Sequence, residues 1–482
     1  MACFVKPYFY ILICICFSTK AQFASNYLAA PIQDTIPYFY SEQIKTRLST
    51  DLLKAANFRG KVAVSMKELL TERAGYVIEN FNDDYFILDP RFTGYLQDVL
   101  AKIYEANPQL PKETTVFAHR SSASNAISFG EGTIAFTLGL LCHLETESQI
   151  AFVLCHELAH YHTNHSNEKI QSIAQLYNSK EFKKELRAIN RSEYGQYTRY
   201  VKLVSSLGIS VSKHGREKEF EADSLAFIYF RNVSNDLNAP IRTLEILDSL
   251  DVDRRIMPIN LKKHFNFSTY PFKESWVAYD SQIIWNNRDK EIPDSLRTHP
   301  SCDLRIKAIQ RQMVKSTAIN SKNLVLGKPA EIVLLSQFER IESQYHLKNY
   351  GRAMHNSLML LEQFPQNAYL HAMVGKCLYQ LYDYQKRHEL GKVLPLPDSR
   401  FGESYDRFLT FLQTLRLSEL KGLTYHYMNE KKEIYSNDED FLFAVWVCAH
   451  IDPQEAILKS IQSEYIRKFP KGKYTQQFSL QF

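Results

Sequence analysis

Residues 156–160 read His156-Glu157-Leu158-Ala159-His160, within an apolar run that has no Gly or Pro and that predicts a helix. Residues four apart on a helix differ by about 40° of rotation and about 6 Å of rise, so both imidazoles can reach one metal ion. Glu157, one residue on, can take a proton from a metal-bound water. The stretch therefore predicts a hydrolytic metal site. The alternative is a chance pattern on an ordinary amphipathic helix, and a third ligand decides between the two.

The third ligand is expected on a later helix. A His six residues past His160 would be one solution, but Ser166 stands there. Glu219 and Asp223 lie further along the chain, are four residues apart and share one face of a predicted helix. We expect Glu219 to bind the metal and Asp223 to accept the outer N–H of a ligand His. The alternative is a solvated, charged helix start.

His162 and His165 add two imidazoles just past the motif. On a continuous helix, residues two and five past His160 point to other faces, because each residue turns the helix by about 100°. We therefore assign neither of them to the metal.

Four stretches of the chain resemble the zinc-dependent metallopeptidase family M48, which includes CAAX prenyl proteases and the Oma-like, HtpX-like and periplasmic BepA-like proteases. They are the motif at 156–160 followed by His165, the stretch Glu219-Phe220-Glu221-Ala222-Asp223, residues 125–140, and Thr298-His299-Pro300 with Arg305 after it. The resemblance covers residues 85–312, and the architecture of the whole chain is most similar to that of the BepA-like proteases. One departure is Phe129-Gly130-Glu131-Gly132, where the family more often has a Pro-Gly-Gly turn at the rim of the cleft.

The resemblance implies a site residue by residue. One Zn²⁺ per chain would be held by His156, His160 and Glu219, with Glu157 as the general base and Asp223 behind the ligands. It further implies that His299 and Arg305 stabilise the oxyanion of the tetrahedral intermediate. The alternative for these two is structural, with His299 at a helix start and Arg305 as a surface charge.

The segment Thr133-Ile134-Ala135-Phe136-Thr137 predicts a strand, because β-branched and aromatic residues lie between Gly132 and Gly139. As an edge strand beside the metal helix it would pair with an extended peptide through main-chain hydrogen bonds. The alternative is a core strand.

The chain is expected to contain three parts. Residues 1–21 read as an export signal, with a basic start and an apolar core too short to span a bilayer. Residues 22–312 form the predicted protease domain, with a helix at 92–106 and insertions at 166–215 and 236–297. The first insertion reads as helical, and the second forms either a lid over the cleft or a packing excursion.

Residues 313–482 are expected to be all-helical. Leu347-Lys348-Asn349-Tyr350 and Leu381-Tyr382-Asp383-Tyr384 are offset by 34 residues, which is typical of a tetratricopeptide unit. The signal is weak, and irregular helical hairpins are the alternative.

These observations predict an α+β, mostly helical protein: a zincin-type (gluzincin) protease domain with a small sheet, followed by an all-α, repeat-like domain. The predicted function is that of an exported zinc metalloendopeptidase, periplasmic or outer-membrane associated in a diderm bacterium, which cleaves extended or misfolded proteins in envelope quality control. The alternatives are a chaperone-like protein of the same fold that cuts little, and a helical scaffold with incidental histidines. Expected partners are protein or peptide substrates and an envelope protein bound through the C-terminal helices. A net charge of +5 is no nucleic-acid signature, and no span is expected in the mature chain.

Overall fold

The computed structural model of the chain describes residues 23–32, 35–192, 195–250, 259–278, 301–315, 329–397 and 402–479. The predicted export signal and His299 lie outside these ranges. The chain divides into two compact units. We call residues 30–251 and 290–337 the sheet unit, and residues 1–29, 252–289 and 338–482 the helical unit.

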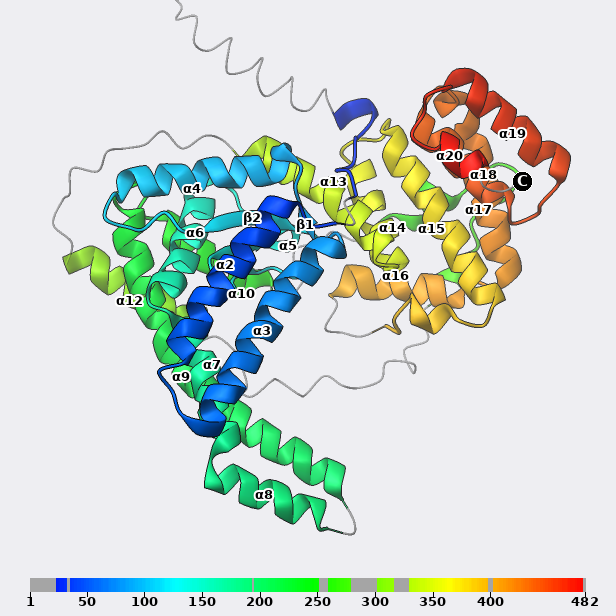
Figure 1. Ribbon diagram of the computed structural model, residues 1–482. Coiled ribbons are helices and arrows are strands. Elements are labelled where there is room, and N and C mark those ends of the chain that lie inside the picture. The colour runs from blue at the N-terminus through cyan, green and yellow to red at the C-terminus, as the bar shows by residue number, and fades with distance from the viewer. Residues whose placement is uncertain are drawn as a thin grey trace, which may run out of the picture. The chain divides into compact units, whose positions relative to one another are not determined.

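The sheet unit contains a small four-stranded sheet in the order β1-β2-β4-β3 (Figure 1). β2 and β4 run parallel in the centre, while β1 and β3 pair antiparallel to them at the two edges. A small sheet in a chain made mostly of helices confirms the predicted α+β, mostly helical class. The strands are β1 (Phe86–Ile87), β2 (Thr115–His119), β3 (Ala126–Ser128) and β4 (Thr133–Thr137).

The strand predicted at residues 133–137 forms, but it lies in the centre of the sheet. All five of its residues are buried between β2 and β3. The prediction of an edge strand at this segment is therefore wrong, and the core-strand alternative is confirmed. The physical reason is the tight turn before β4, which folds the three residues of β3 back over it. The exposed edge on this side of the sheet belongs to β3.

The turn between β3 and β4 contains the departure from the expected Pro-Gly-Gly pattern. Gly130 and Gly132 have φ angles of +87° and +114°, which favour glycine because it has no Cβ. Glu131 between them is buried, accepts the backbone N–H of Thr133 at 3.0 Å and lies 3.2 Å from Arg47 Nη1. The extra carboxylate therefore closes the turn.

Helices make up the rest of the sheet unit. The helix predicted at residues 92–106 is confirmed as a π turn at Pro90–Gly94 followed by α4, which buries an apolar face. The insertion at 166–215 is helical where it is described, and α8 and the start of α9 form a hairpin that projects from this unit (Figure 1). The helices are α2 (Tyr38–Ala55), α3 (Gly60–Asn82), α4 (Tyr95–Ala106), α5 (Leu138–Leu141), α6 (Glu147–His162), α7 (His165–Asn178), α8 (Lys180–Asn190), α9 (Gln196–Phe230), α10 (Ala239–Leu250) and α12 (Cys302–Lys315).

The described part of the C-terminal third contains helices joined by turns and loops and no strand, as predicted. Its α-helices pack as successive hairpins, among them α14 against α15 and α17 against α18. They are α13 (Ala330–His346), α14 (Tyr350–Leu361), α15 (Ala368–Lys386), α16 (Glu403–Thr414), α17 (Leu417–Tyr435), α18 (Glu439–Ala449), α19 (Glu455–Lys468) and α20 (Thr475–Ser479).

The two similar quartets in this region occupy different structural positions. Residues 347–350 form the turn between α13 and α14 and the first residue of α14, whereas residues 381–384 lie inside α15. Equivalent repeats would place them alike, so the offset of 34 residues does not relate equivalent helices. Irregular helical hairpins describe this arrangement better.

An N-terminal segment of the chain completes the helical unit. Phe23 and Tyr27 are 1% and 4% exposed, and both rings stack on Phe338, at centroid distances of 5.2 and 4.9 Å. The backbone carbonyl of Phe23 accepts Asn367 Nδ2 at 2.8 Å, and the Tyr27 hydroxyl donates to Glu339. The helical unit therefore includes residues from both ends of the sequence.

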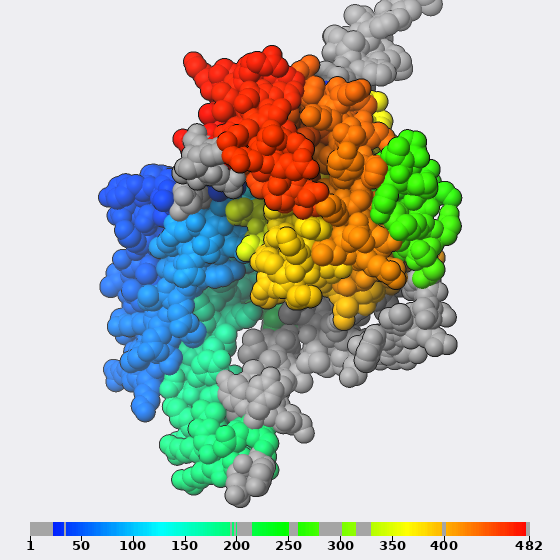
Figure 2. All heavy atoms as spheres, turned by 90° about the vertical axis from the view of Figure 1, so that its right-hand side faces the viewer, coloured from blue at the N-terminus to red at the C-terminus, as the bar shows by residue number. Residues whose placement is uncertain are grey.

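Part of the second predicted insertion also packs in the helical unit. Phe265, at the end of α11 (Leu261–Phe265), stacks on Phe411, and Trp276 Nε1 donates to Glu419 Oε1 at 2.9 Å. Figure 2 shows this segment, in green, against the orange surface of α16 and α17. For residues 236–297 we expected either a lid or a packing excursion. The described residues 261–276 pack in the helical unit, and α10 packs on α6 and α12 in the sheet unit.

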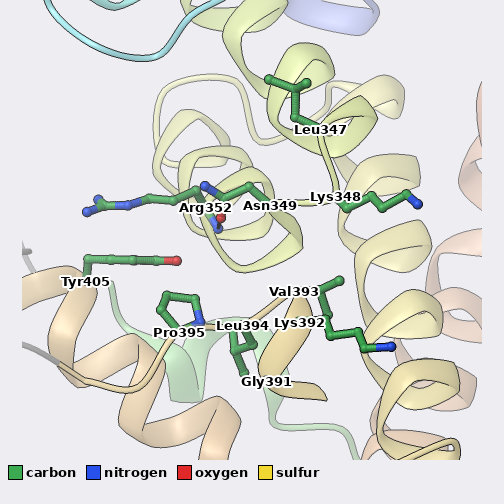
Figure 3. A pocket seen from close by; sticks show the side chains of 10 residues that line it. All are labelled: Leu347, Lys348, Asn349, Arg352, Gly391, Lys392, Val393, Leu394, Pro395 and Tyr405. Carbon is green, nitrogen blue, oxygen red and sulfur yellow. Dashed lines mark hydrogen bonds between the residues drawn. The ribbon is translucent and has the colours of Figure 1, made fainter. Parts of the chain in front are cut away.

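A pocket of about 300 Å³ lies in the helical unit beside the start of α14 (Figure 3). The guanidinium of Arg352 stacks over the ring of Tyr405 at 3.5 Å from the ring centroid, and Leu394 and Pro395 supply apolar walls. Gly351 keeps this wall tight, since a Cβ there would come within 2.7 Å of Leu394 Cδ1.

None of the helices in the described part of the chain is long and apolar enough to cross a membrane. The described cysteines are Cys142, Cys155, Cys302, Cys377 and Cys448, and all of them are free thiols.

We predict that Phe23→Ala destabilises the helical unit, because Phe-to-Ala changes in a core cost about 3–5 kcal/mol. Urea unfolding followed by tryptophan fluorescence will measure the loss, since Trp276 and Trp446 lie in this unit. Leu28→Ala is the matched control: Leu28 belongs to the same segment but is 67% exposed, so the change in the free energy of unfolding should stay within about 0.5 kcal/mol. Equal effects of the two variants would contradict this account.

Candidate metal centre

The helix α6, which carries the motif, is fixed at its start and buried along most of its length. Thr146 Oγ1 accepts the Gln149 N–H at 3.2 Å, and Gln149 Oε1 accepts the Thr146 N–H at 3.3 Å, which forms a capping box. Thirteen residues from Glu147 to Ala159 are buried. A helix that is buried on all sides has little freedom to rotate or slide, so it holds His156 and His160 on one defined face.

The helix α9 supplies the remaining acidic residues of the centre. It packs along α6, and Phe230 near its end meets Phe152 of α6 edge to face at 5.8 Å. Glu219 and Asp223, one turn apart on α9, are 7% and 1% exposed. Because a charge buried this deeply needs a partner or a metal, their position against α6 is a first indication of a cation site.

Three side chains converge within this interface: His156, His160 and Glu219. The two Nε2 atoms lie 3.1 Å apart, and each lies 3.5 Å from a carboxylate oxygen of Glu219. Ligands about 2.0–2.1 Å from a tetrahedral zinc ion are about 3.4 Å from one another, which is close to these separations. Two imidazoles and one carboxylate also form a common ligand set of catalytic zinc sites, so the residues present fit a zinc ion.

Behind the ligands lies a buried ion pair. Arg305 of α12 donates through Nε and Nη2 to the two oxygens of Asp223, both at 2.7 Å. Asp223 Oδ1 also lies 3.0 Å from His156 Nδ1, the ring nitrogen that faces away from the ligand group. Arg305 Nη2 lies 3.7 Å from Glu219 as well. Arg305 thus contacts Asp223, and Asp223 in turn contacts His156, one of the three residues that converge.

The charges in this group shift several pKa values. Burial opposes protonation of His156, but the adjacent carboxylates of Asp223 and Glu219 outweigh it and raise the pKa of His156 to about 10. Burial and the neighbouring His156 lower the pKa of His160 to about 3. Burial would raise the pKa of Asp223, yet the charge and hydrogen bonds of Arg305 hold it at about 2. The two carboxylates thus favour positive charge where the imidazole nitrogens converge, which is where a divalent cation would bind.

Glu157 is held by the edge strand. Its Oε2 accepts the backbone N–H of Ser128 at 2.7 Å, and its side chain is buried. This backbone N–H fixes the position of the carboxylate beside the ligand histidines of α6. Sequence reasoning placed Glu157 beside the metal but could not find Ser128, because a backbone donor leaves no signal in residue type.

The structure brings most of the predicted site residues together. His156, His160, Glu219, Asp223 and Arg305 form one contiguous cluster. Predicted residue His299 falls outside the described part of the chain. The metal-binding group found among the described residues includes neither of the two histidines that sequence reasoning set aside, His162 and His165.

The part of the chain that contains this centre matches a known protein family. The sequence model of Peptidase family M48 matches residues 90–313. The part of the chain that holds the centre belongs to peptidase family M48. The matched residues contain the metal-binding group together with Asp223 and Arg305. No curated protein matches the chain.

Family membership gives the centre its chemistry. M48 peptidases depend on zinc, so the chain is a zinc metallopeptidase, and the cluster of His156, His160 and Glu219 is the group able to hold a metal ion.

We predict that Glu219→Ala loses most of the bound zinc, because removing one ligand of three weakens a zinc site severely. Metal analysis of the purified protein measures the stoichiometry. Glu217→Ala, an exposed position on the same helix, is the matched control and should keep its zinc. Nearly full occupancy in the Glu219→Ala protein would show that another residue is the third ligand, with Glu221 as the first to examine.

Proposed function

We propose that the chain is a zinc metalloendopeptidase that cleaves extended or misfolded proteins, with Glu157 as its general base. The observation that carries the proposal is the convergence of His156, His160 and Glu219 beside a base that is itself anchored on the sheet edge. A bound zinc ion would supply a coordinated water with a pKa of about 7 and would polarise the scissile carbonyl.

The residues of this chain would hold and move the protons. The Glu157 carboxylate takes the proton of the attacking water and delivers it to the leaving amine. The N–H of Ser128 keeps the carboxylate in position during both transfers. Asp223 holds His156 through Nδ1, so that Nε2 points toward the ligand group.

An extended substrate would pair with β3, the edge strand. Residues 125, 127 and 129 of this segment pair with β4, so the peptide groups of Ala126 and Ser128 point away from the sheet. The groups of Ser128 are engaged, its N–H by Glu157 and its carbonyl by the Ser166 hydroxyl at 3.1 Å. Ala126 therefore offers the pairing position, next to the base. Pairing through the main chain alone tolerates many side chains, which suits a protease of unfolded proteins.

We also propose that Arg305 and His299 stabilise the oxyanion of the tetrahedral intermediate. Arg305 uses Nε and Nη2 on Asp223, so its second role would fall to Nη1. His299 enters through the resemblance alone.

Export and a role in envelope quality control are likewise proposals. They are supported by the apolar start of the sequence and by a helical unit that is large enough to bind a partner. We also propose that each chain binds one zinc ion.

We predict that Glu157→Gln keeps its zinc while hydrolysis of an unfolded protein substrate falls by at least about 100-fold. A Gln oxygen can still accept the Ser128 N–H, so the side chain stays in place and only its basicity is lost. Glu217→Gln serves as the control and should cleave like the wild type. Undiminished cleavage by Glu157→Gln would refute this mechanism. A variant that is inactive yet still supports growth of a deletion strain would favour the chaperone-like alternative.

We further predict that Arg305→Ala lowers the stability of the sheet unit by about 3–5 kcal/mol, because it leaves Asp223 buried without its charge partner. Arg305→Lys keeps the charge but only part of the bonding and should lose less. In zinc-loaded protein, a fall in kcat without a rise in KM would support the second role at the oxyanion. Unchanged kcat would limit Arg305 to the support of Asp223.

A further inference from the structure

The imidazole of His165 lies against His160, although sequence spacing on a straight helix points it elsewhere. The helix α6 ends at His162, and Asn164 then adopts a left-handed conformation with φ of 62°. Asn tolerates this region better than most residues. The chain therefore reverses within two residues, and α7 begins with His165 turned back toward the metal helix.

The contact is short and its geometry is defined. His165 Nδ1 lies 3.0 Å from His160 Nδ1, and His165 Nε2 lies 3.2 Å from Glu221 Oε2. His165 is buried, at 5% exposure, whereas the side chain of Glu221 is 57% exposed. Three polar groups thus form a chain from solvent to the ligand His160.

Metal ligation fixes the direction of this chain. His160 turns Nε2 toward the ligand group, so a neutral imidazole must carry its proton on Nδ1. That N–H donates to Nδ1 of His165, which must then carry its own proton on Nε2 and donate it to Glu221. Each of the two imidazoles then carries one proton and donates it, and the Glu221 carboxylate accepts.

We propose that His165 is a positioning residue of the metal centre, which fixes the tautomer and the ring orientation of His160 in the way that Asp223 does for His156. The inference rests on the proposed zinc site. It assigns the two ligand histidines different supports: His156 has a buried carboxylate, and His160 has a neutral imidazole with a half-exposed carboxylate behind it. Supports of this kind typically change metal affinity by about 10–100-fold when they are removed.

The experiment measures the zinc affinity of the full-length protein by competition with a chromophoric chelator. His165→Leu has a similar volume and no acceptor, and it should raise the zinc dissociation constant by about 10–100-fold. His165→Asn places an amide oxygen close to the position of Nδ1 and should restore most of the affinity. Glu221→Gln should have a small effect, about threefold or less, since Glu221 is largely solvated.

His162→Leu is the matched control, because it makes the same chemical change three residues away, at the end of α6. The ring of His162 contacts Tyr161 and Tyr229 and is not part of the metal-binding group. Its zinc affinity should stay that of the wild type.

Three results would overturn the inference: wild-type affinity in His165→Leu, an equal loss in His162→Leu, or a His165→Asn protein as weak as His165→Leu, which would indicate packing alone. A wild type that binds zinc but cleaves nothing would remove the proposed function and leave this inference standing. A wild type that binds no zinc would overturn both.

Discussion

The buried pair of Arg305 and Asp223 is the interaction on which the centre depends. It ties α12 to α9, and through Asp223 it reaches His156 on α6, so three helices from distant parts of the sequence share one charge network. Removing one partner of such a pair costs about 3–5 kcal/mol, because the other charge remains out of water. The same pair keeps Asp223 ionised, with a pKa of about 2. Its position therefore determines both the local packing and the state of the first ligand.

The centre joins a rigid side and an accessible side. On the rigid side, α6 and α9 bury their ligands among apolar residues, and the carboxylates have fixed partners. On the accessible side, the edge strand β3 meets Glu157 through one backbone N–H and leaves Ala126 to pair outward. A hydrolytic site needs both properties, since the groups that react must stay in place while an extended chain enters and leaves.

The sequence predicts this site well where the spacing of residues along one helix determines which side chains lie together. The spacing of four places His156 beside His160 and Glu219 beside Asp223, and helical geometry does the rest. It fails where the chain turns. His165 is not in the metal-binding group, as expected, but it lies against His160 because Asn164 breaks the helix. The strand at 133–137 is central because a glycine turn folds β3 over it. Long-range contacts such as that of Phe23 with Phe338, or of Trp276 with Glu419, have no periodic signal and could not be predicted.

Because the helical unit contains residues from both ends of the sequence, it can fold completely only after its C-terminal residues have been synthesised. Asn26 donates to Asp438 at 2.6 Å, and Phe23 and Tyr27 pack on Phe338, so the earliest described residues need partners that are made last. At about 5–20 residues per second, a ribosome reaches Asp438 about 20–80 s after Asn26. For most of that interval, until Phe338 has been made, the rings of Phe23 and Tyr27 have no Phe338 to pack on. The helical unit is therefore completed only after nearly the whole chain exists, and a truncated or stalled chain keeps an exposed apolar end.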